Sequence, residues 1–504
     1  MLPGINKNYL MVMLTALVVS YTAYGQGSTP WGNTASGQIS TPLELFTADS
    51  SFRHASLSVC FRDLATGDIT EEYFSDMSVG SASVMKLLTT AVALETLGPS
   101  FRFKTTVSYT GTIDAAGTLY GDIIITGGGD PALGSDHFSS HYGDFISEWC
   151  RQIKAAGIRR INGNITGDGS LFGFSPAPGG WSWSDLGNYY GAGAHALSVY
   201  DNMFRIHLRS GETGTAPVIT ATEPEIPGFR VTSHLTAMGT SDRGYVYSIP
   251  YSESAYILGT IPPNRDDFVL KASLPDPPLL AAINLFNALK ESGTEITGRP
   301  VTLRESERNG GSTAPEKRNL IYTTLSPTLI ELITITNRES INLYAENILR
   351  GIELADGIPG TAVVADSAIQ MVYRFLEENG IESSGLFMDD GSGLSRYNAI
   401  TASVITDFLC HIKSRGRYGE LFYSSLPAAG RDGTLRPYFR DPVFAGRMVA
   451  KSGTSTRIRN YAGYIKTFSG KEYAFAVLVN NYEGTVADVS EKTGKLLKWW
   501  IENR

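Results

Sequence analysis

The stretch SASVMKLLTT, from Ser81 to Thr90, places a serine and a lysine three residues apart, at Ser83 and Lys86. Apolar residues follow at helical spacing, so a helix is expected to begin here. Residues three apart in a helix share a face, and a neutral lysine on that face can take the proton of a serine hydroxyl and make it a nucleophile. The alternative is a solvated lysine at a helix end, and the stretch alone does not decide between the two.

Two further motifs follow in the second half of the chain. Ser340 and Asn342 form a Ser-x-Asn motif within a region of helical periodicity, and the sequence KSGT, from Lys451 to Thr454, lies on a predicted strand. A Ser-x-x-Lys match alone occurs by chance in most chains of this length. In the order Ser-x-x-Lys, Ser-x-Asn and Lys-Ser-Gly, however, the motifs are typical of serine enzymes that recognise penicillin.

The residue types of these motifs suggest complementary roles around Ser83. Lys86 can act as a base only when it is neutral, and burial together with the positive charge of Lys451 would lower its pKa. Ser340 can relay a proton between a leaving amine and the two lysines. Asn342 can hold Lys86 and a substrate amide at the same time. These five residues are the predicted catalytic set.

The KSGT strand is predicted to bind the substrate. Its edge can pair with an extended peptide, and the backbone N–H groups of Ser83 and Thr454 would form an oxyanion hole. Ser452, Gly453 and Thr454 are therefore predicted substrate-binding residues. The C-terminal carboxylate of a peptide would lie near Lys451, Ser452 or Thr454.

Four longer stretches add to the three motifs: GGGDPALGS (127–135), DGSGLSRYN (390–398), LPAAGRDGTL (426–435) and AGYI (462–465). Together the chain resembles the D-Ala-D-Ala carboxypeptidases and endopeptidases of peptidase family S13, low-molecular-mass penicillin-binding proteins of the penicillin-binding protein 4 type. The long gap between Ser83 and Ser340 is similar to this family, whose members carry extra domains there. The resemblance covers nearly the whole chain after its N-terminal leader.

The resemblance implies an α/β fold. A penicillin-recognising serine transpeptidase-like (β-lactamase-like) domain, with an antiparallel sheet flanked by helices, would be split by a β-rich inserted domain that carries a further small β domain. The implied activity is that of a serine-type D-Ala-D-Ala carboxypeptidase, a DD-endopeptidase or both, acting on peptidoglycan stem peptides and cross-links through an acyl-enzyme on Ser83. β-Lactam antibiotics would acylate Ser83 as covalent inhibitors, and no cofactor is implied.

The stretch GGWSWSDLGNYY (179–190) supplies further candidates. In the family this stretch faces the active site, and Asp185 resembles the residue that binds the amino end of the stem-peptide diamino acid. An aromatic wall that includes Tyr190, with one carboxylate, suits an ammonium ligand. Arg396 can bind a substrate carboxylate. The alternatives are a packed tryptophan cluster with a solvated Asp185, and a loop-supporting ion pair of Arg396.

The length of the chain predicts several domains, because 504 residues are too many for one core. Helical periodicity in the first and last parts is interrupted by short alternating runs between glycines, which indicate β-rich inserted material. The predicted division is a signal peptide (1–25), the first part of the transpeptidase-like domain (26–104), the first part of the inserted domain (105–215), a nested small β domain (216–268), the return of the inserted domain (269–317) and the second part of the transpeptidase-like domain (318–504).

Composition narrows the choice of partner and compartment. The net charge of −8 argues against nucleic acid as the main partner. The apolar run from Tyr9 to Ala23 predicts a cleaved secretory signal rather than a permanent membrane anchor, with Gln26 first in the mature chain and export across the inner membrane to the periplasm. Cys60, Cys150 and Cys410 are expected to be buried small hydrophobes. The scattered histidines predict no metal site.

Two other readings of the sequence stay open. The first is a β-lactamase or an esterase on the same scaffold, but fast deacylation needs a group that activates water, and none is recognisable. The second is a non-catalytic cell-wall-binding protein, against which the three intact motifs speak. The sequence predicts neither an oligomeric state nor the balance between carboxypeptidase and endopeptidase activity.

Overall fold

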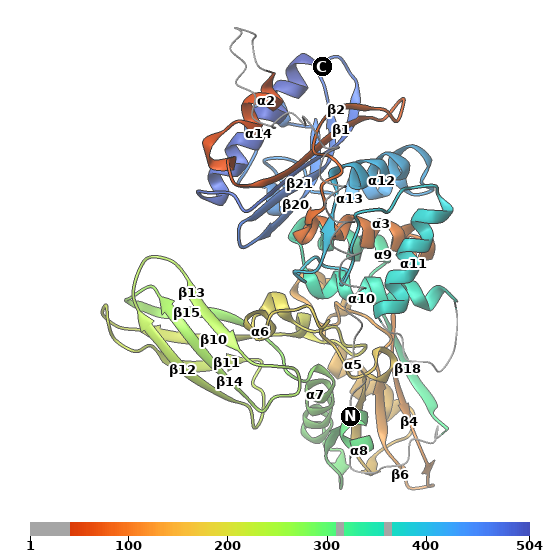
Figure 1. Ribbon diagram of the computed structural model, residues 1–504. Helices are drawn as coiled ribbons and strands as arrows, with labels where there is room; N and C mark the ends of the chain where they lie inside the picture. Colours follow the sequence, from red (N-terminus) through yellow and green to blue (C-terminus); the bar gives the residue numbers. More distant parts are fainter. Residues whose placement is uncertain (1–40, 309–316, 357–364) are drawn as a thin grey trace, which may run out of the picture.

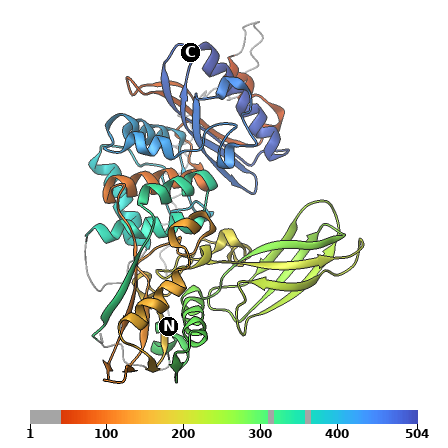
Figure 2. The same cartoon turned by 180° about the vertical axis from the view of Figure 1, so that it is seen from behind.

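The computed structural model describes residues 41–308, 317–356 and 365–504. The predicted signal peptide lies outside these residues. No helix within the described ranges is long and apolar enough to cross a membrane. Figure 1 shows a column made of an upper sheet, a middle layer of helices and a lower sheet, and Figure 2 shows from behind how a small β unit projects from the side of this column.

The elements have the following bounds. The helices are α2 (Pro42–Thr47), the 3-10 turn η2 (Ala82–Met85), α3 (Lys86–Leu97), α4 (Ser139–Tyr142), α5 (Phe145–Ala155), α6 (Trp183–Leu186), α7 (Pro277–Glu291), α8 (Leu303–Arg308), α9 (Leu329–Glu339), α10 (Asn342–Glu353), α11 (Ala365–Glu378), α12 (Ala402–Arg415), α13 (Gly419–Ser425) and α14 (Val486–Asn503). The strands are β1 (Ser56–Asp63), β2 (Ile69–Tyr73), β3 (Val79–Gly80), β4 (Lys104–Tyr109), β5 (Thr112–Ile113), β6 (Thr118–Tyr120), β7 (Ile123–Thr126), β8 (Arg160–Asn162), β9 (Ile165–Asp168), β10 (Met203–Ser210), β11 (Val218–Glu223), β12 (Arg230–Ala237), β13 (Arg243–Tyr247), β14 (Ser254–Ile261), β15 (Arg265–Ser273), β16 (Glu295–Ile296), β17 (Pro300–Thr302), β18 (Asn319–Leu325), β19 (Ala399–Ile400), β20 (Met448–Ser455), β21 (Ile458–Lys466) and β22 (Glu472–Asn480).

The upper sheet brings the two ends of the described chain together. Its order is β2-β1-β22-β21-β20, and every neighbouring pair is antiparallel. Alternate residues of β22 point to opposite faces: Phe475 and Val477 join the core under α14 that contains Trp500, whereas Ala476 and Leu478 join the core on the side of α12. Both faces of the sheet are therefore covered by helices, which confirms the predicted fold class.

The middle layer surrounds α3 with other helices. α3 contacts α9, α10 and α11, and its residues from Lys86 to Leu94 are all buried. A helix that is apolar on all sides belongs in a core. The one charged residue in that run, Lys86, is thus held away from water by the helix that carries it.

The inserted part of the chain forms two β-rich units. In the lower unit, sheets of order β17-β9-β7-β4-β18 and β16-β8-β6-β5 pack with α5 and α7. In the small unit, the sheets β11-β10-β15 and β12-β14-β13 share a core of their own that includes Phe204, Leu235 and Ile257. α6 joins this unit to the column, because it contacts β13.

The sheets suggest where the domains divide. β10 and β15 belong to the same sheet as β11, so we propose that the small β domain comprises residues 203–273, extending the predicted 216–268 at both ends. We propose that the lower unit comprises 104–202, 274–308 and 317–325. The remaining described residues would form the transpeptidase-like domain.

Cys60, Cys150 and Cys410 are all buried and unpaired. Burial raises the pKa of Cys60 to about 11, so its thiol stays protonated. The cysteines therefore act as small packing residues, as their apolar surroundings in the sequence predict.

Candidate active site

Ser83 lies in the turn η2, directly before α3. The turn is held from the upper sheet, because Asn460 Nδ2 on β21 donates to the carbonyl oxygens of Gly80 at 2.8 Å and Ser81 at 2.9 Å. Ala82 has φ +42°, in the left-handed region that residues with a side chain rarely occupy. Such strain persists where the surroundings enforce it, and it is frequent beside reactive groups. Sheet and helix thus fix the position of Ser83 together.

Lys86 makes three hydrogen bonds through its Nζ. It donates to Ser83 Oγ at 3.1 Å, to Asn342 Oδ1 at 2.6 Å and to the carbonyl oxygen of Ser392 at 2.6 Å. The side chain is fully buried. A neutral amine has two N–H groups and one lone pair. With Asn342 and Ser392 accepting the two N–H groups, the lone pair is left toward Ser83 Oγ and can accept the hydroxyl proton, as a general base requires.

Burial lowers the pKa of Lys86 to about 7. Desolvation is the largest cause, and the negative charges of Asp390 and Glu346 act in the opposite direction. Burial also raises the pKa of Glu346 to about 8, so near neutral pH this carboxyl is mostly protonated. Lys86 can thus be neutral near neutral pH, as activation of Ser83 needs.

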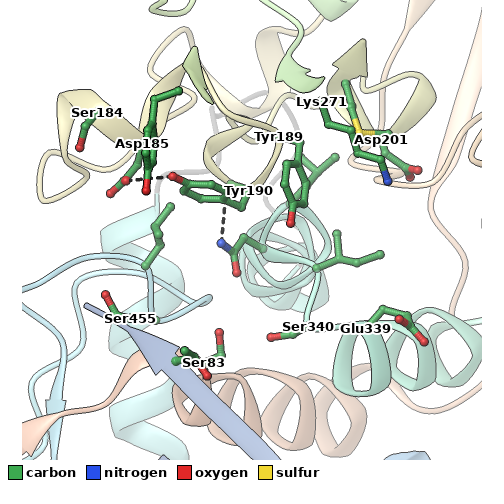
Figure 3. A pocket seen from close by; sticks show the side chains of 18 of the residues that line it. Ser83, Ser184, Asp185, Tyr189, Tyr190, Asp201, Lys271, Glu339, Ser340 and Ser455 are labelled. Atoms are coloured by element: carbon green, nitrogen blue, oxygen red, sulfur yellow. Dashed lines mark hydrogen bonds between the residues drawn. The ribbon is translucent and has the colours of Figure 1, made fainter. Parts of the chain in front are cut away.

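Ser340 occupies the junction between α9 and α10. The sequence predicts the Ser-x-Asn motif inside a helical region. In the structure Ser340 is instead the C-cap residue of α9, with φ +62°, and Asn342 is the first residue of α10. This break turns the Ser340 side chain toward the cleft (Figure 3). Among the described residues no hydrogen bond joins Ser340 to Ser83, and Ser340 Oγ instead accepts a hydrogen bond from Lys451.

Lys451 is fully buried on β20. Its Nζ donates to Ser340 Oγ at 2.8 Å and to the carbonyl oxygen of Ser452 at 2.9 Å. Burial lowers the pKa of Lys451 well below its usual range, and the charges of Lys86 and Arg459 add to this effect. Two buried lysines with depressed pKa values next to two serines can accept and return protons.

Asn342 connects Lys86 to the inserted part of the chain. Its Oδ1 accepts from Lys86, and its Nδ2 donates to the carbonyl oxygen of Tyr190 at 2.8 Å. The sequence predicts that this amide contacts both Lys86 and the substrate. In the structure the amide oxygen binds Lys86 and the amide nitrogen binds the Tyr190 carbonyl group, so the side chain of Asn342 links Lys86 to the Tyr190 backbone.

The KSGT segment of β20 runs alongside the nucleophile turn. A Cβ on Gly453 would lie 2.9 Å from the Ser81 carbonyl oxygen and 3.2 Å from the Ser83 nitrogen, so only glycine fits without displacement. Ser452 Oγ donates to Thr434 Oγ1 at 2.9 Å. Thr454 is exposed, and the strand therefore presents it beside Ser83 in the cleft.

A cleft of about 770 Å³ opens above these residues. Figure 3 shows Ser83 and Ser340 on one side of it, and Asp185, Tyr189 and Tyr190 on the opposite side. The predicted residues Lys86, Lys451, Ser452 and Gly453 lie behind its wall. The predicted residues that line the cleft are Ser83, Ser340, Asn342, Thr454, Asp185, Tyr190 and Arg396.

Asp185 and Tyr190 form the wall contributed by the inserted part. Tyr190 OH donates to Asp185 Oδ1 at 3.4 Å. Burial raises the pKa of Asp185, while the positive charge of Arg396 acts against this. Trp181, by contrast, is buried and donates from Nε1 to Asp390 Oδ2 at 2.7 Å. The tryptophan thus packs, but the carboxylate of Asp185 faces the cleft.

Arg396 is exposed and lines the same cleft. Within the described ranges it forms no ion pair at or below 4.0 Å, so the loop-supporting ion pair considered from the sequence is not present there. The loop is ordered instead by Asp390, which accepts hydrogen bonds from the backbone of Gly393 at 2.6 Å and Ser395 at 2.6 Å.

Several residues of the site lack a recognisable signal in the sequence. Backbone carbonyl groups of Ser392 and Tyr190 hold Lys86 and Asn342, and such contacts do not depend on the side-chain type. Further lining residues are Tyr189, Tyr245, Tyr247 and Lys271, which come from the small β unit and the segment before it. Within the part of the chain that the structure describes, no group of three acidic, histidine or cysteine side chains could hold a metal ion.

A helix-flanked antiparallel sheet with a Ser-x-x-Lys turn beside its edge strand defines the class of penicillin-recognising serine hydrolases. The family model "D-Ala-D-Ala carboxypeptidase 3 (S13) family" matches residues 39–499. The chain therefore belongs to this family. The predicted family and the predicted activity, that of a serine-type D-Ala-D-Ala carboxypeptidase, are confirmed.

Individual relatives agree with this assignment. The chain is 24% identical to a D-alanyl-D-alanine carboxypeptidase of an Actinomadura species, over 91% of this chain and 84% of that one. It is also 24% identical to D-alanyl-D-alanine carboxypeptidase DacB of Haemophilus influenzae, over 86% of each chain. The crystal structure of penicillin binding protein 4 (dacB) from H. influenzae matches with a TM-score of 0.76 and 22% identity, covering 89% of this chain and 97% of that one.

Proposed function

We propose that Ser83 is the nucleophile with which this serine peptidase cleaves D-Ala-D-Ala bonds of peptidoglycan stem peptides, and the corresponding D-Ala bonds of cross-links. The observation that carries the proposal is the 3.1 Å hydrogen-bond contact between Lys86 Nζ and Ser83 Oγ, which the serine hydroxyl donates when the lysine is neutral, in a buried setting that lowers the lysine pKa to about 7. Few other arrangements activate a serine without histidine.

In the proposed acylation step, Ser83 Oγ attacks the carbonyl carbon of the penultimate D-Ala, and its proton passes to neutral Lys86. The tetrahedral oxyanion receives hydrogen bonds from the backbone N–H groups of Ser83 and Thr454. The C–N bond then breaks, and the leaving amine takes a proton from the Lys86 and Lys451 pair through Ser340. The contact between Lys451 and Ser340, at 2.8 Å, supports this relay.

In the proposed deacylation step, water attacks the ester on Ser83. A neutral lysine of the pair takes a proton from the water, and Ser83 regains its proton as the ester bond breaks. β-Lactams would enter the same acylation step, because their strained amide is cleaved by the same attack. The fold is similar to that of penicillin binding protein 4 from H. influenzae in a crystal structure with a β-lactam, with a TM-score of 0.71 and 21% identity.

The substrate side of the cleft supports recognition of a stem peptide. Asp185 would bind the free amino group of the diamino acid, with Tyr190 beside it. Thr454, which lines the cleft, would bind the C-terminal carboxylate, and Arg396 would bind a second carboxylate of the peptide. Ser452 is buried and donates to Thr434, so it would support this strand and not contact the carboxylate. Such a peptide lies outside the cytoplasm, so we also propose that the chain is exported to the periplasm.

The experiment is the digestion of two purified substrates. A stem pentapeptide that ends in D-Ala-D-Ala reports carboxypeptidase activity through released D-alanine, and a cross-linked muropeptide dimer reports endopeptidase activity through monomer formation. Wild-type protein is expected to cleave at least one of them and the Lys86→Ala variant neither. Equal turnover by wild type and Lys86→Ala would overturn the proposed roles.

A further inference from the structure

An aromatic face lies on the small β unit outside the catalytic motifs. Tyr247 of β13 and Tyr256 of β14 are directly opposite each other, with ring centroids 5.1 Å apart and planes inclined by 9°. Trp183 of α6 lies 4.8 Å from the Tyr247 ring and 6.1 Å from the Tyr256 ring. Tyr245 precedes Tyr247 by two residues on β13, so the two side chains lie on the same face of the strand.

These rings are not the core of the small unit. That core lies on the other face of β13 and β14, where Val246 and Ile257 are buried. Trp183 is 55% exposed and Tyr245 is 48% exposed. Neighbouring large aromatic side chains that remain exposed to solvent usually mark a binding surface, because a folded protein gains stability when such side chains are buried.

The aromatic face continues into the catalytic cleft. Tyr245 and Tyr247 line the cleft that also contains Ser83, and Tyr189 and Lys271 lie in the same wall. Lys271 Nζ lies 5.8 Å above the Tyr189 ring, and within the described ranges it makes no ion pair at or below 4.0 Å. A ligand whose peptide reaches Ser83 would thus extend over these rings.

We propose that Trp183, Tyr256 and their neighbours form a platform for the sugar rings of peptidoglycan glycan strands. The inference rests on the proposed function, since the stem peptide in the cleft is attached to a glycan. Pyranose rings present flat C–H faces that pack on aromatic rings, and their hydroxyl groups need polar neighbours. The protein would then bind its substrate as a polymer and not as an isolated peptide.

The surroundings favour a sugar over an apolar protein surface. On β14 the residues that share a face with Tyr256 are Ser254, Leu258 and Thr260, and Thr232 of the adjacent strand β12 lies opposite Tyr256. The rings are thus bordered mainly by hydroxyl-bearing residues. A docking site for a protein would be expected to have a larger aliphatic centre.

Co-sedimentation with glycan strands from which an amidase has removed the stem peptides tests the proposal without any need for catalysis. Wild-type protein is expected to bind the strands. Tyr256→Ala and Trp183→Ala are each expected to weaken binding about fivefold or more, whereas Tyr256→Phe, which keeps the ring, retains it. Tyr120→Ala, at a tyrosine on β6 of the lower unit that is 53% exposed, close to the 55% of Trp183, is the control and leaves binding unchanged.

Hydrolysis assays with two substrates test the glycan platform and the proposed function independently. Tyr256 does not line the cleft, so Tyr256→Ala is expected to cleave a soluble D-Ala-D-Ala peptide at the wild-type rate but intact sacculi more slowly. Failure of wild type to cleave the peptide would refute the proposed function alone. Absence of wild-type binding to peptide-free glycan, undiminished binding by both alanine variants, or binding only to isolated stem peptides would overturn the platform.

Discussion

Lys86 Nζ lies 3.1 Å from Ser83 Oγ and is fully buried. Burial, rather than a neighbouring cation, is the main cause of its lowered pKa, because the nearby negative charges of Asp390 and Glu346 raise the pKa. The second lysine, Lys451, is paired with Ser340 and not with Ser83. The two lysines thus contact different serines.

The first prediction concerns pH. Neutral Lys86 is the proposed base, and its pKa is about 7. Below that pH the lysine becomes protonated, so the rate of acylation by a penicillin should fall about tenfold per pH unit. Above it the rate should reach a plateau. Second-order acylation rates measured from pH 5.5 to 9 check this. A rate that stays constant down to pH 5.5 would contradict Lys86 as the base.

The second prediction concerns the close approach of β20 to the nucleophile turn. Gly453→Ala adds a Cβ 2.9 Å from the Ser81 carbonyl oxygen, which must push the strand away from Ser83. A displacement of this kind should reduce acylation about a hundredfold. Gly179→Ala is the matched control, because its added Cβ meets no atom within 4 Å. Equal acylation rates for the two variants would show that the oxyanion hole does not depend on this contact.

The third prediction concerns Arg459 on β21. This buried guanidinium donates to Thr454 Oγ1, stacks 4.5 Å from the Tyr438 ring and leaves its Nη2 without a hydrogen-bond partner in the described structure. Arg459 should hold the Thr454 side chain in position, and its positive charge should favour a substrate carboxylate bound there. Arg459→Gln is expected to lower kcat/KM about tenfold for a peptide with a free C-terminal carboxylate, and much less for the corresponding C-terminal amide.

The neighbouring Arg457 gives the control for that prediction. It is exposed at the turn between β20 and β21. Arg457→Gln should leave the kcat/KM values for both peptides unchanged. If Arg459→Gln lowered the values for the carboxylate and the amide equally, Arg459 would be a packing residue and not a determinant of carboxylate recognition.

The fourth prediction concerns Asp185. Its carboxylate faces the cleft beside Tyr190. Asp185→Asn keeps the shape but removes the charge, so KM should rise about tenfold for a stem peptide whose diamino acid carries a free amino group. A peptide with that amino group acetylated should be hydrolysed alike by both proteins. A similar rise in KM for both peptides would argue against an ammonium subsite.

Much of this arrangement could be predicted from the sequence. The alternation of Leu57, Val59 and Phe61 before a turn predicts the β1–β2 hairpin, and the helical spacing of apolar residues after Lys86 up to Gly98-Pro99 predicts α3. The periodicity does not predict that β1 and the first turns of α3 are buried on all sides. The three motifs predict which side chains meet. Nothing in the sequence alone predicts that α9 ends at Ser340, since no glycine or proline marks that break.

The wider site depends on contacts between distant segments. The carbonyl groups of Ser392 and Tyr190 act through the backbone, and any residue type supplies a carbonyl. The sequence indicates a small β unit, but its periodicity does not reveal that Tyr245 and Tyr247 line the same cleft as Ser83. Which faces of separate units meet is determined by tertiary packing, and local periodicity carries no information about it.

Labelling with a penicillin tests the central assignment most directly. Intact-protein mass spectrometry should show one penicilloyl group per chain, and peptide mapping should locate it on Ser83. A stable adduct would favour a peptidase over a β-lactamase, because a β-lactamase releases the adduct quickly. The Ser83→Ala variant should remain unlabelled while keeping the wild-type fold by circular dichroism. Absence of an adduct on the wild-type protein, or an adduct that persists in Ser83→Ala, would contradict the assignment of Ser83 as the nucleophile.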